Sequence, residues 1–185
     1  MRVFRTSVAT FVSLVMVSVL CAQETPQFQQ PTKEHQWLQQ FVGEWESTSE
    51  VSMGPDLPAM TCKGTSNYRM LGGFWLINET QGDMMGTKID AIQTIGYDTE
   101  TKKYVGTWVD SMLNHLWNYE GSVDAAGTKL ILEAEGPNFM AAGKLAKFRD
   151  SYEFKSPDHI EATSSMLGEE GKWVQFMTGQ LRRKK

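Results

Sequence analysis

Turn-forming residues divide this sequence into ten short runs of strand-like residues, and most joints between the runs are too short to hold helices. The clearest joints are rich in Gly, Asp, Pro and Ser: Gly72-Gly73, Asp98 to Lys102, Asp124 to Gly127, Ser156 to Asp158 and Gly168 to Gly171. Parallel neighbours would need crossover connections of about a dozen residues or more, which are usually helical. The chain is therefore predicted to be all-β, with consecutive strands antiparallel.

The ten runs follow one another at intervals typical of an all-β sandwich or barrel. They lie roughly at residues 44–53, 60–71, 74–81, 87–97, 103–112, 114–123, 128–135, 146–155, 159–167 and 172–182. An open sheet of ten strands would leave two exposed edges, and closure of the sheet removes both. We therefore predict a single antiparallel up-and-down β-barrel of about ten strands.

A short helix is expected just before the first strand, where it would close one end of the barrel. Between Thr32 and Val42, the apolar residues recur at helical spacing: Trp37, Leu38, Phe41 and Val42. After the helix, Gly43 lets the backbone pass close beneath a neighbour, and the Trp45 indole ring lies on one face of the new strand. Gly43 and Trp45 are therefore predicted to form the floor of the barrel.

The N-terminal residues predict export. Residues 1–22 have the basic start, the apolar core and the small residue of a secretory signal peptide, with cleavage expected after Ala22. Lipoprotein anchoring at Cys21 is the alternative. Residues 23–32 are rich in Gln and Pro and are interpreted as a flexible leader, and residues 33–185 as the barrel domain. The expected location is the periplasm or the exterior of the cell.

Length, charge and cysteine content narrow the class of protein. Removal of residues 1–22 would leave 163 of the 185 residues, which suits one domain with a sizeable core. The formal net charge would change from −4 to −6 because two arginines are removed, and an acidic surface argues against nucleic acid as a partner. Cys62 alone would remain, so no intramolecular disulfide is possible. No stable membrane span is expected after signal removal.

Alternation along the strands places many aromatic side chains on the same face as Trp45. A ten-strand barrel is wider than the eight-strand kind, whose own side chains fill it, so space for a small apolar or amphipathic molecule is expected inside. The alternative is that these residues only pack on one another as core. The predicted ligand-binding residues are Tyr68, Tyr104, Trp108, Asp110, His115, Trp117, Tyr119, Tyr152 and Trp173.

Polar residues on inward faces are the candidates for chemistry, because a buried polar group needs a partner or a task. Asp110, His115 and Asp150 share their faces with large aromatic residues. They could act as acid and base, or they could orient a ligand through hydrogen bonds. No residue is assigned as catalytic. The three histidines are far apart and no C-x-x-C occurs, so neither a metal nor a cofactor is predicted.

Several segments together resemble, in order and spacing, the bacterial family called domain of unknown function 1579. They cover nearly all of the chain after the signal peptide: Phe41 to Trp45, Leu71 to Phe74, Gly96 to Asp98, Tyr104 to Asp110, Glu120-Gly121, Phe148 to Glu153 and Arg182. The function of that family is uncharacterised. The resemblance therefore implies a fold and little chemistry.

More distantly, Gly43-x-Trp45 after a short helix, with an arginine near the end of the last strand, resembles the pattern of lipocalins and other calycins. This resemblance implies that the arginine packs over the Trp45 ring, and Arg182 is the matching residue. The chain departs from lipocalins in its strand count and its lack of their disulfide. Haem-binding relatives of the nitrobindin type use a histidine on the iron, and no matching histidine occurs near the end of this chain.

Three functions stay open at the level of sequence. The first is an exported, non-enzymatic barrel that binds a small apolar or amphipathic ligand in an aromatic-lined cavity. The second is a hydrolase or isomerase that uses Asp110, His115 and Asp150. The third is a structural or interaction protein of the cell envelope with a filled barrel, which an exposed apolar patch would favour.

Overall fold

The computed structural model describes residues 28–52, 54 and 58–185. The predicted signal peptide, residues 1–22, lies outside the described residues, as do residues 23–27 of the predicted leader. Pro31–Lys185 form one compact unit. In the described part of the chain, no helix is long and apolar enough to cross a membrane.

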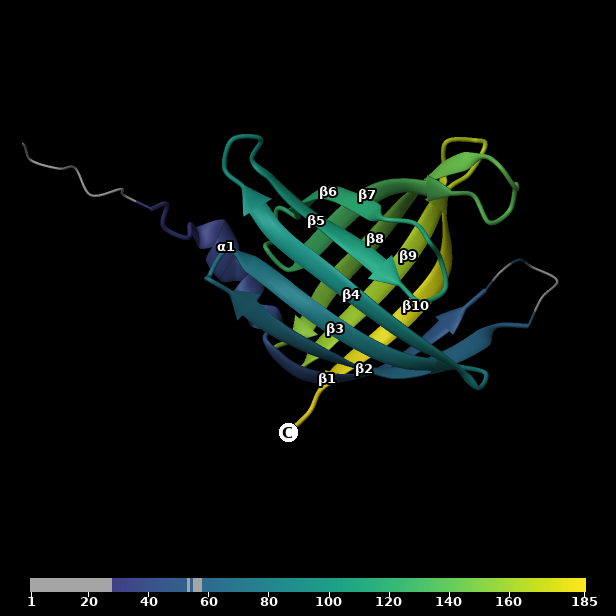
Figure 1. The fold of residues 1–185 in the computed structure, drawn as a ribbon, viewed down its shortest axis with the longest axis horizontal. Coiled ribbons are helices and arrows are strands. Elements are labelled where there is room, and N and C mark those ends of the chain that lie inside the picture. Colours follow the sequence, from purple (N-terminus) through teal and green to yellow (C-terminus); the bar gives the residue numbers. More distant parts are fainter. Residues whose placement is uncertain (1–27, 53, 55–57) are drawn as a thin grey trace, which may run out of the picture. The chain divides into compact units, whose positions relative to one another are not determined.

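Ten antiparallel strands form a closed barrel in up-and-down order (Figure 1). The strands are β1 (Gly43–Val51), β2 (Met60–Leu71), β3 (Trp75–Met84), β4 (Thr87–Asp98), β5 (Lys103–Asp110), β6 (Trp117–Val123), β7 (Lys129–Pro137), β8 (Leu145–Ser156), β9 (His159–Leu167) and β10 (Trp173–Arg183). Each strand pairs with its neighbours in sequence, and β1 also pairs with β10. The predicted fold class and strand count are confirmed.

The barrel is built from strands whose inward positions alternate with outward ones. On β7, Leu130, Leu132 and Ala134 are buried while their neighbours keep some exposure. At Gly106 even a methyl group would not fit, because a Cβ there would lie 1.9 Å from the carbonyl oxygen of Thr94. Glycine at this position therefore permits the close approach of β4 and β5, as expected for a bend in a barrel.

A short helical segment covers the end of the barrel where β1 begins. It consists of α1 (Lys33–Trp37) and a 3-10 turn, η1 (Leu38–Phe41), and Thr32 is the N-cap residue of α1. Leu38 and Phe41 are fully buried, and the Trp45 indole nitrogen donates to the Phe41 carbonyl oxygen at 2.7 Å. The helical segment and Trp45 thus close this end together, as predicted.

The arginine that packs over the Trp45 ring is Arg183, so the expectation for Arg182 was wrong. The Arg183 guanidinium carbon lies 4.2 Å from the ring centroid. The same guanidinium donates to the backbone carbonyls of Val42 at 2.5 Å and Gln40 at 2.8 Å. Side chains alternate along β10, and Leu181 is buried in the interior, so Arg183 shares the inward phase while Arg182 is exposed.

Both ends of the compact unit lie at this closed end. Pro31 is near Gly73 in the turn between β2 and β3. The Lys184 backbone N–H donates to the Glu44 carbonyl oxygen at 2.8 Å, so the chain finishes beside the start of β1 (Figure 1).

Replacing Arg183 tests its role in closure. Arg183→Met is expected to lower the free energy of unfolding by about 2 to 4 kcal/mol, because it removes the cation–π contact and charged hydrogen bonds to backbone carbonyls. Arg182→Met makes the same chemical change on the outer face and is expected to cost less than about 0.5 kcal/mol. Urea denaturation followed by circular dichroism measures both. Equal losses in the two variants would contradict this assignment.

Candidate functional site

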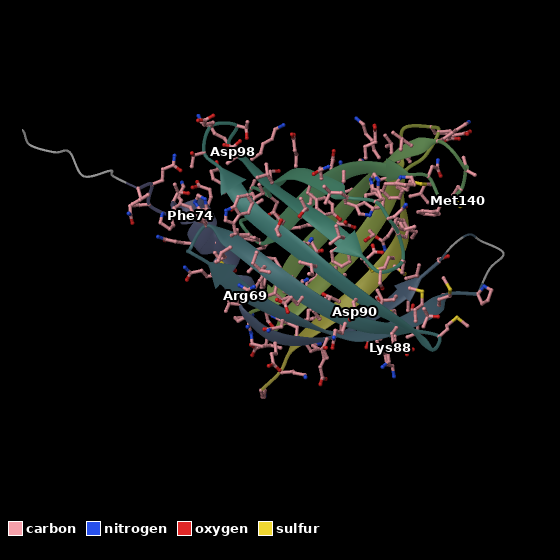
Figure 2. The ribbon with its side chains drawn as sticks, in the orientation of Figure 1. Arg69, Phe74, Lys88, Asp90, Asp98 and Met140 are labelled. Atoms are coloured by element: carbon pink, nitrogen blue, oxygen red, sulfur yellow. The ribbon has the colours of Figure 1, made fainter. Side chains whose placement is uncertain are left out.

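The candidate site is the half of the barrel interior away from α1, toward the loops that follow β1, β3, β5, β7 and β9. We call it the open half. In Figure 2, Phe74 lies beside the helix and Met140 lies in a loop at the opposite end. Near the helix many inward side chains are almost completely buried, and others keep partial exposure. The buried ones include Leu38, Trp45, Leu76, Leu130, Leu132 and Ile160, and the partly exposed ones include Met70, Tyr97, Val123 and Phe154. In the open half the inward side chains keep partial exposure: Cys62, Thr80, Trp108, Trp117, Met166 and Met177. The interior is therefore filled at one end and accessible at the other.

A buried carboxylate network lies within this interior. Asp150 on β8 accepts hydrogen bonds from the Tyr119 hydroxyl on β6 and the Ser164 hydroxyl on β9, each at 2.5 Å. Burial raises the pKa of Asp150, while the two hydrogen bonds act in the opposite direction. Burial also raises the pKa of Tyr119, and the nearby Asp150 charge raises it further. The site therefore disfavours added negative charge.

Asp150 and Tyr152 show that the interior contains accessible space. Burial is the main reason that the pKa of each is raised, so both lie deep in the protein. Both side chains nevertheless keep part of their surface accessible to solvent. A deeply placed polar side chain that keeps accessible surface borders a space large enough for water. The two residues therefore line a space inside the barrel.

A second polar contact crosses the barrel from one wall to another. The Gln93 amide nitrogen on β4 donates to the Tyr152 hydroxyl on β8 at 3.2 Å. These strands are separated by β5, β6 and β7, so the contact spans the interior. The Tyr152 ring packs edge-on against Phe41 of the closed end, with ring centroids 5.9 Å apart. Gln93 and Tyr152 therefore stand at the boundary between the filled and open halves.

Aromatic side chains line the open half near its mouth. Trp117 packs edge-on against Phe148, with ring centroids 5.0 Å apart. Phe139, from the loop between β7 and β8, contacts Phe148 and Phe176 at centroid distances of 5.8 Å and 5.2 Å. The Trp117 ring lies against Gly136 on β7, where a Cβ would be 2.2 Å from the ring. The mouth is thus bordered by rings held in fixed positions by their neighbours.

Several of the nine predicted ligand-binding residues lie together, and the rest have other surroundings. Trp108, Trp117, Tyr119 and Tyr152 face the interior. Tyr68 and Tyr104 are buried in the hydrophobic core. Tyr68 packs against Phe41, and the Tyr104 hydroxyl donates to the Glu34 carbonyl oxygen at 3.0 Å. These two tyrosines therefore belong to the closed end.

Asp110 and His115 lie at the rim, and neither is hydrogen-bonded to Asp150. Asp110 accepts from the Trp108 indole at 2.8 Å and from the backbone N–H groups of Met112 and Leu113, so it shapes the loop after β5. These loop bonds explain why β6 begins at Trp117 and leaves His115 outside the strand. The His115 ring packs on Trp117, with centroids 4.9 Å apart.

Trp173 faces away from the other predicted residues. It lies on the outer face, where the Arg149 guanidinium carbon is 4.0 Å from its ring centroid. The register of β10 shifts between Gln175 and Met177, so Trp173 and Met177 occupy opposite faces. A regular strand would have placed them on the same face, which is the alternation that the sequence analysis assumed.

Sequence reasoning missed Gln93 and Ser164 because it considered only ionisable groups on the inward faces. The alternation of inward and outward positions along each strand could have identified both residues. Gln93 stands between Ala91 and Ile95, both of which are buried, and Ser164 follows Ala162 at the same spacing. For metals, the described residues contain no group of three His, Cys, Asp or Glu side chains that could hold an ion.

The fold and the site define the class: a closed ten-stranded up-and-down barrel, capped and filled at one end, with an accessible, aromatic-lined interior at the other. Residues 30–183 match the sequence model of the family described as "Protein of unknown function (DUF1579)". This match spans most of the chain, and the protein belongs to that family. No functionally curated protein matches it in sequence.

Two solved structures have similar folds. The Rv2717c protein from M. tuberculosis is 12% identical, with a TM-score of 0.62 over 84% of this chain and 100% of that one. The S-type phycobiliprotein lyase CPES from Guillardia theta is 13% identical, with a TM-score of 0.56 over 82% of this chain and 93% of that one. At these identities the likeness is one of fold.

The raised pKa of Asp150 predicts a distinctive pH dependence. The folded protein holds the Asp150 proton more tightly than the unfolded chain, so stability from this group is lost as pH rises between the unfolded and folded pKa values. Asp150→Asn cannot ionise. Its free energy of unfolding, relative to wild type, should therefore increase as pH rises above about 4 and then level off. Urea denaturation across this pH range measures the difference.

Asp98→Asn provides a control of opposite sign. Hydrogen bonds from Thr101 and Glu100 lower the pKa of Asp98 in an exposed turn. The ionised Asp98 therefore stabilises the fold above its unfolded pKa, and that variant should lose stability relative to wild type as pH rises. A pH-independent difference for Asp150→Asn would show that its carboxyl is not desolvated.

Proposed function

We propose that this protein binds a small apolar or amphipathic molecule in the open half of the barrel. The proposal rests on the difference in burial of inward side chains between the two ends of the barrel interior. The helix end is packed with fully buried aliphatic and aromatic residues, whereas the other end keeps accessible inward surface on Trp108, Trp117 and Met166. A concave, largely apolar interior with a few placed polar groups is the usual form of a small-molecule site.

The composition of the wall supports an apolar guest. Trp117, Phe148 and Phe176 offer ring faces and edges, and Met166 and Met177 offer flexible side chains that fit irregular shapes. Burial of about 200 Å² of apolar ligand surface would contribute about 5 kcal/mol before the costs of association. An interior of this kind therefore favours a ligand with an extended hydrophobic part.

The rim of the mouth supports the same class of ligand. Large hydrophobic side chains in and beside the loops at this end are about half exposed or more: Met85, Met112, Leu113, Leu116, Met140 and Leu145. Exposed apolar residues grouped around an opening are a recognised feature of binding sites. Here they would provide a continuous apolar surface from the solvent to the interior.

A second candidate function, acid–base catalysis on a bound molecule, is favoured by one feature. Asp150 is a buried carboxyl group with a raised pKa, beside the Tyr119 hydroxyl and an accessible space. Perturbed carboxyl groups in such positions are candidates for general acids and bases. The Guillardia theta protein of similar fold is named a lyase. The role would belong to Asp150 with Tyr119, since Asp110 and His115 bond other partners.

Export remains part of the proposal. It rests on the basic start and apolar core of residues 1–22. An exported binding protein would meet its ligand in the periplasm or outside the cell.

Native mass spectrometry of the protein purified from its own host tests the binding function. The expected result is an added mass that survives gentle ionisation and is released on unfolding. The mass of the unfolded protein is expected to correspond to a chain that begins at Gln23. A protein that carries no added mass and binds none of a panel of apolar dyes would contradict the proposal. Turnover of the released molecule, lost in Asp150→Asn, would instead support catalysis.

Two tryptophan variants test the position of the site. Trp117→Ala removes an inward ring and is expected to weaken binding of Nile red, a neutral apolar dye, by about tenfold or more. Trp173→Ala removes an outward ring and is expected to change binding by less than about twofold. Fluorescence titration measures both affinities. Trp117→Phe keeps an aromatic ring and serves as a control for loss of folding. Equal weakening by the two alanine variants would place the site elsewhere.

A further inference from the structure

We infer that the ligand has a neutral head group that both donates and accepts a hydrogen bond, such as a hydroxyl or an amide, attached to an apolar body. Gln93 and Tyr152 would bind this head group at the inner limit of the open half, with the apolar body directed toward the mouth. The inference rests on the proposed binding function and specifies its ligand class.

The first observation is an unpartnered acceptor deep in the barrel. Gln93 is only 1% exposed, and its amide oxygen is the buried side-chain polar atom without a hydrogen-bond partner among the described residues. Leaving a buried acceptor unpaired is costly, and such atoms are rare in native proteins. The amide lies within the interior, because its nitrogen reaches across to Tyr152 on a distant strand. A ligand donor at this point would satisfy the oxygen.

The second observation is the hydroxyl beside it. The Tyr152 oxygen accepts from the Gln93 nitrogen, and no acceptor for the Tyr152 hydroxyl hydrogen is found among the described residues. The pair therefore offers one acceptor and one donor side by side. If the amide is turned over, Tyr152 donates to its oxygen and the amide nitrogen becomes the free donor. A head group that both donates and accepts fits the pair in either orientation.

The third observation is the electrostatic setting, which disfavours an anionic head group. Asp150 lies two residues from Tyr152 on β8 and has only hydroxyl partners, Tyr119 and Ser164, among the described residues. Burial of Tyr152 raises its pKa, and the nearby Asp150 charge raises it further, so this region resists a further negative charge. A carboxylate or sulfate head group would meet the same resistance. A neutral polar group avoids it.

Three probes with one ten-carbon chain separate these requirements. Decanol donates and accepts, decyl methyl ether only accepts, and decanoate is charged. Isothermal titration calorimetry of the full-length mature protein is expected to show decanol binding about tenfold or more tightly than either of the other two. Decanamide, which also donates and accepts, should bind like decanol.

A matched pair of variants assigns the preference to Gln93. In Gln93→Met the side chain keeps its length and loses its amide. The affinities for decanol and decyl methyl ether are then expected to lie within about twofold of each other. Gln81→Met makes the same change on the exposed outer face and should leave the ratio as in wild type. A ratio that persists in Gln93→Met would reflect the bulk of the ether methyl group and would overturn the inference.

The outcomes separate the two proposals. Equal binding of decanol and decyl methyl ether by the wild type would overturn the inference, because Gln93 would then bond only to water. The binding function would still stand. Tightest binding of decanoate would also overturn it, since the site would then favour an anion. Failure of all four probes to bind would count against the binding function and the inference together.

Discussion

The packing of Arg183 over Trp45 joins the two ends of a sheet that must meet for the barrel to exist. Its guanidinium contacts the indole ring and the backbone just before β1, and it also donates to the Pro157 carbonyl between β8 and β9. One side chain thus ties the first strand, the last strand and a turn. The helical segment then covers the ring from below, with Phe41 accepting the indole hydrogen. Once this end is fixed and filled, inward rings such as Trp108 and Trp117 keep accessible surface toward the opposite loops.

Two polar contacts lie in the interior above this floor, and the first of them crosses it from one wall to another. Gln93 reaches Tyr152 from β4 to β8, and Tyr119 reaches Asp150 from β6 to β8. Each contact places a hydrogen-bonding group where a purely apolar core would pack more simply, at a desolvation cost that the raised pKa values of Asp150 and Tyr152 make visible. Under the proposed binding function, the apolar wall beyond them would attract a hydrophobic body. The polar pair explains how a site could prefer one head group over another.

The sequence predicted most of the fold but only part of the candidate site, and the difference has a physical reason. Glycine, proline and aspartate mark turns locally, so ten strands and a closed meander followed from short-range chemistry. Inward and outward positions follow from alternation only while a strand is regular. The shifted register of β10 moved Trp173 outside, and the Asp110 loop bonds removed His115 from β6. Contacts such as Gln93 with Tyr152 depend on which strands face each other across the interior, and that information is not local.

Both ends of the folded unit emerge at its closed end, beside Gly73 and Glu44. Among the described residues, the mouth is bordered by the loops that follow β3, β5, β7 and β9, whereas Pro31 and Lys184 lie at the other end. A tether attached through either end, whether a lipid anchor, a linker or an engineered fusion, would hold the barrel by its floor and leave the opening turned away from the point of attachment. The architecture therefore separates the points of attachment of the folded unit from its mouth. Such a protein could be fixed to a surface or a sensor without obstructing its own entrance.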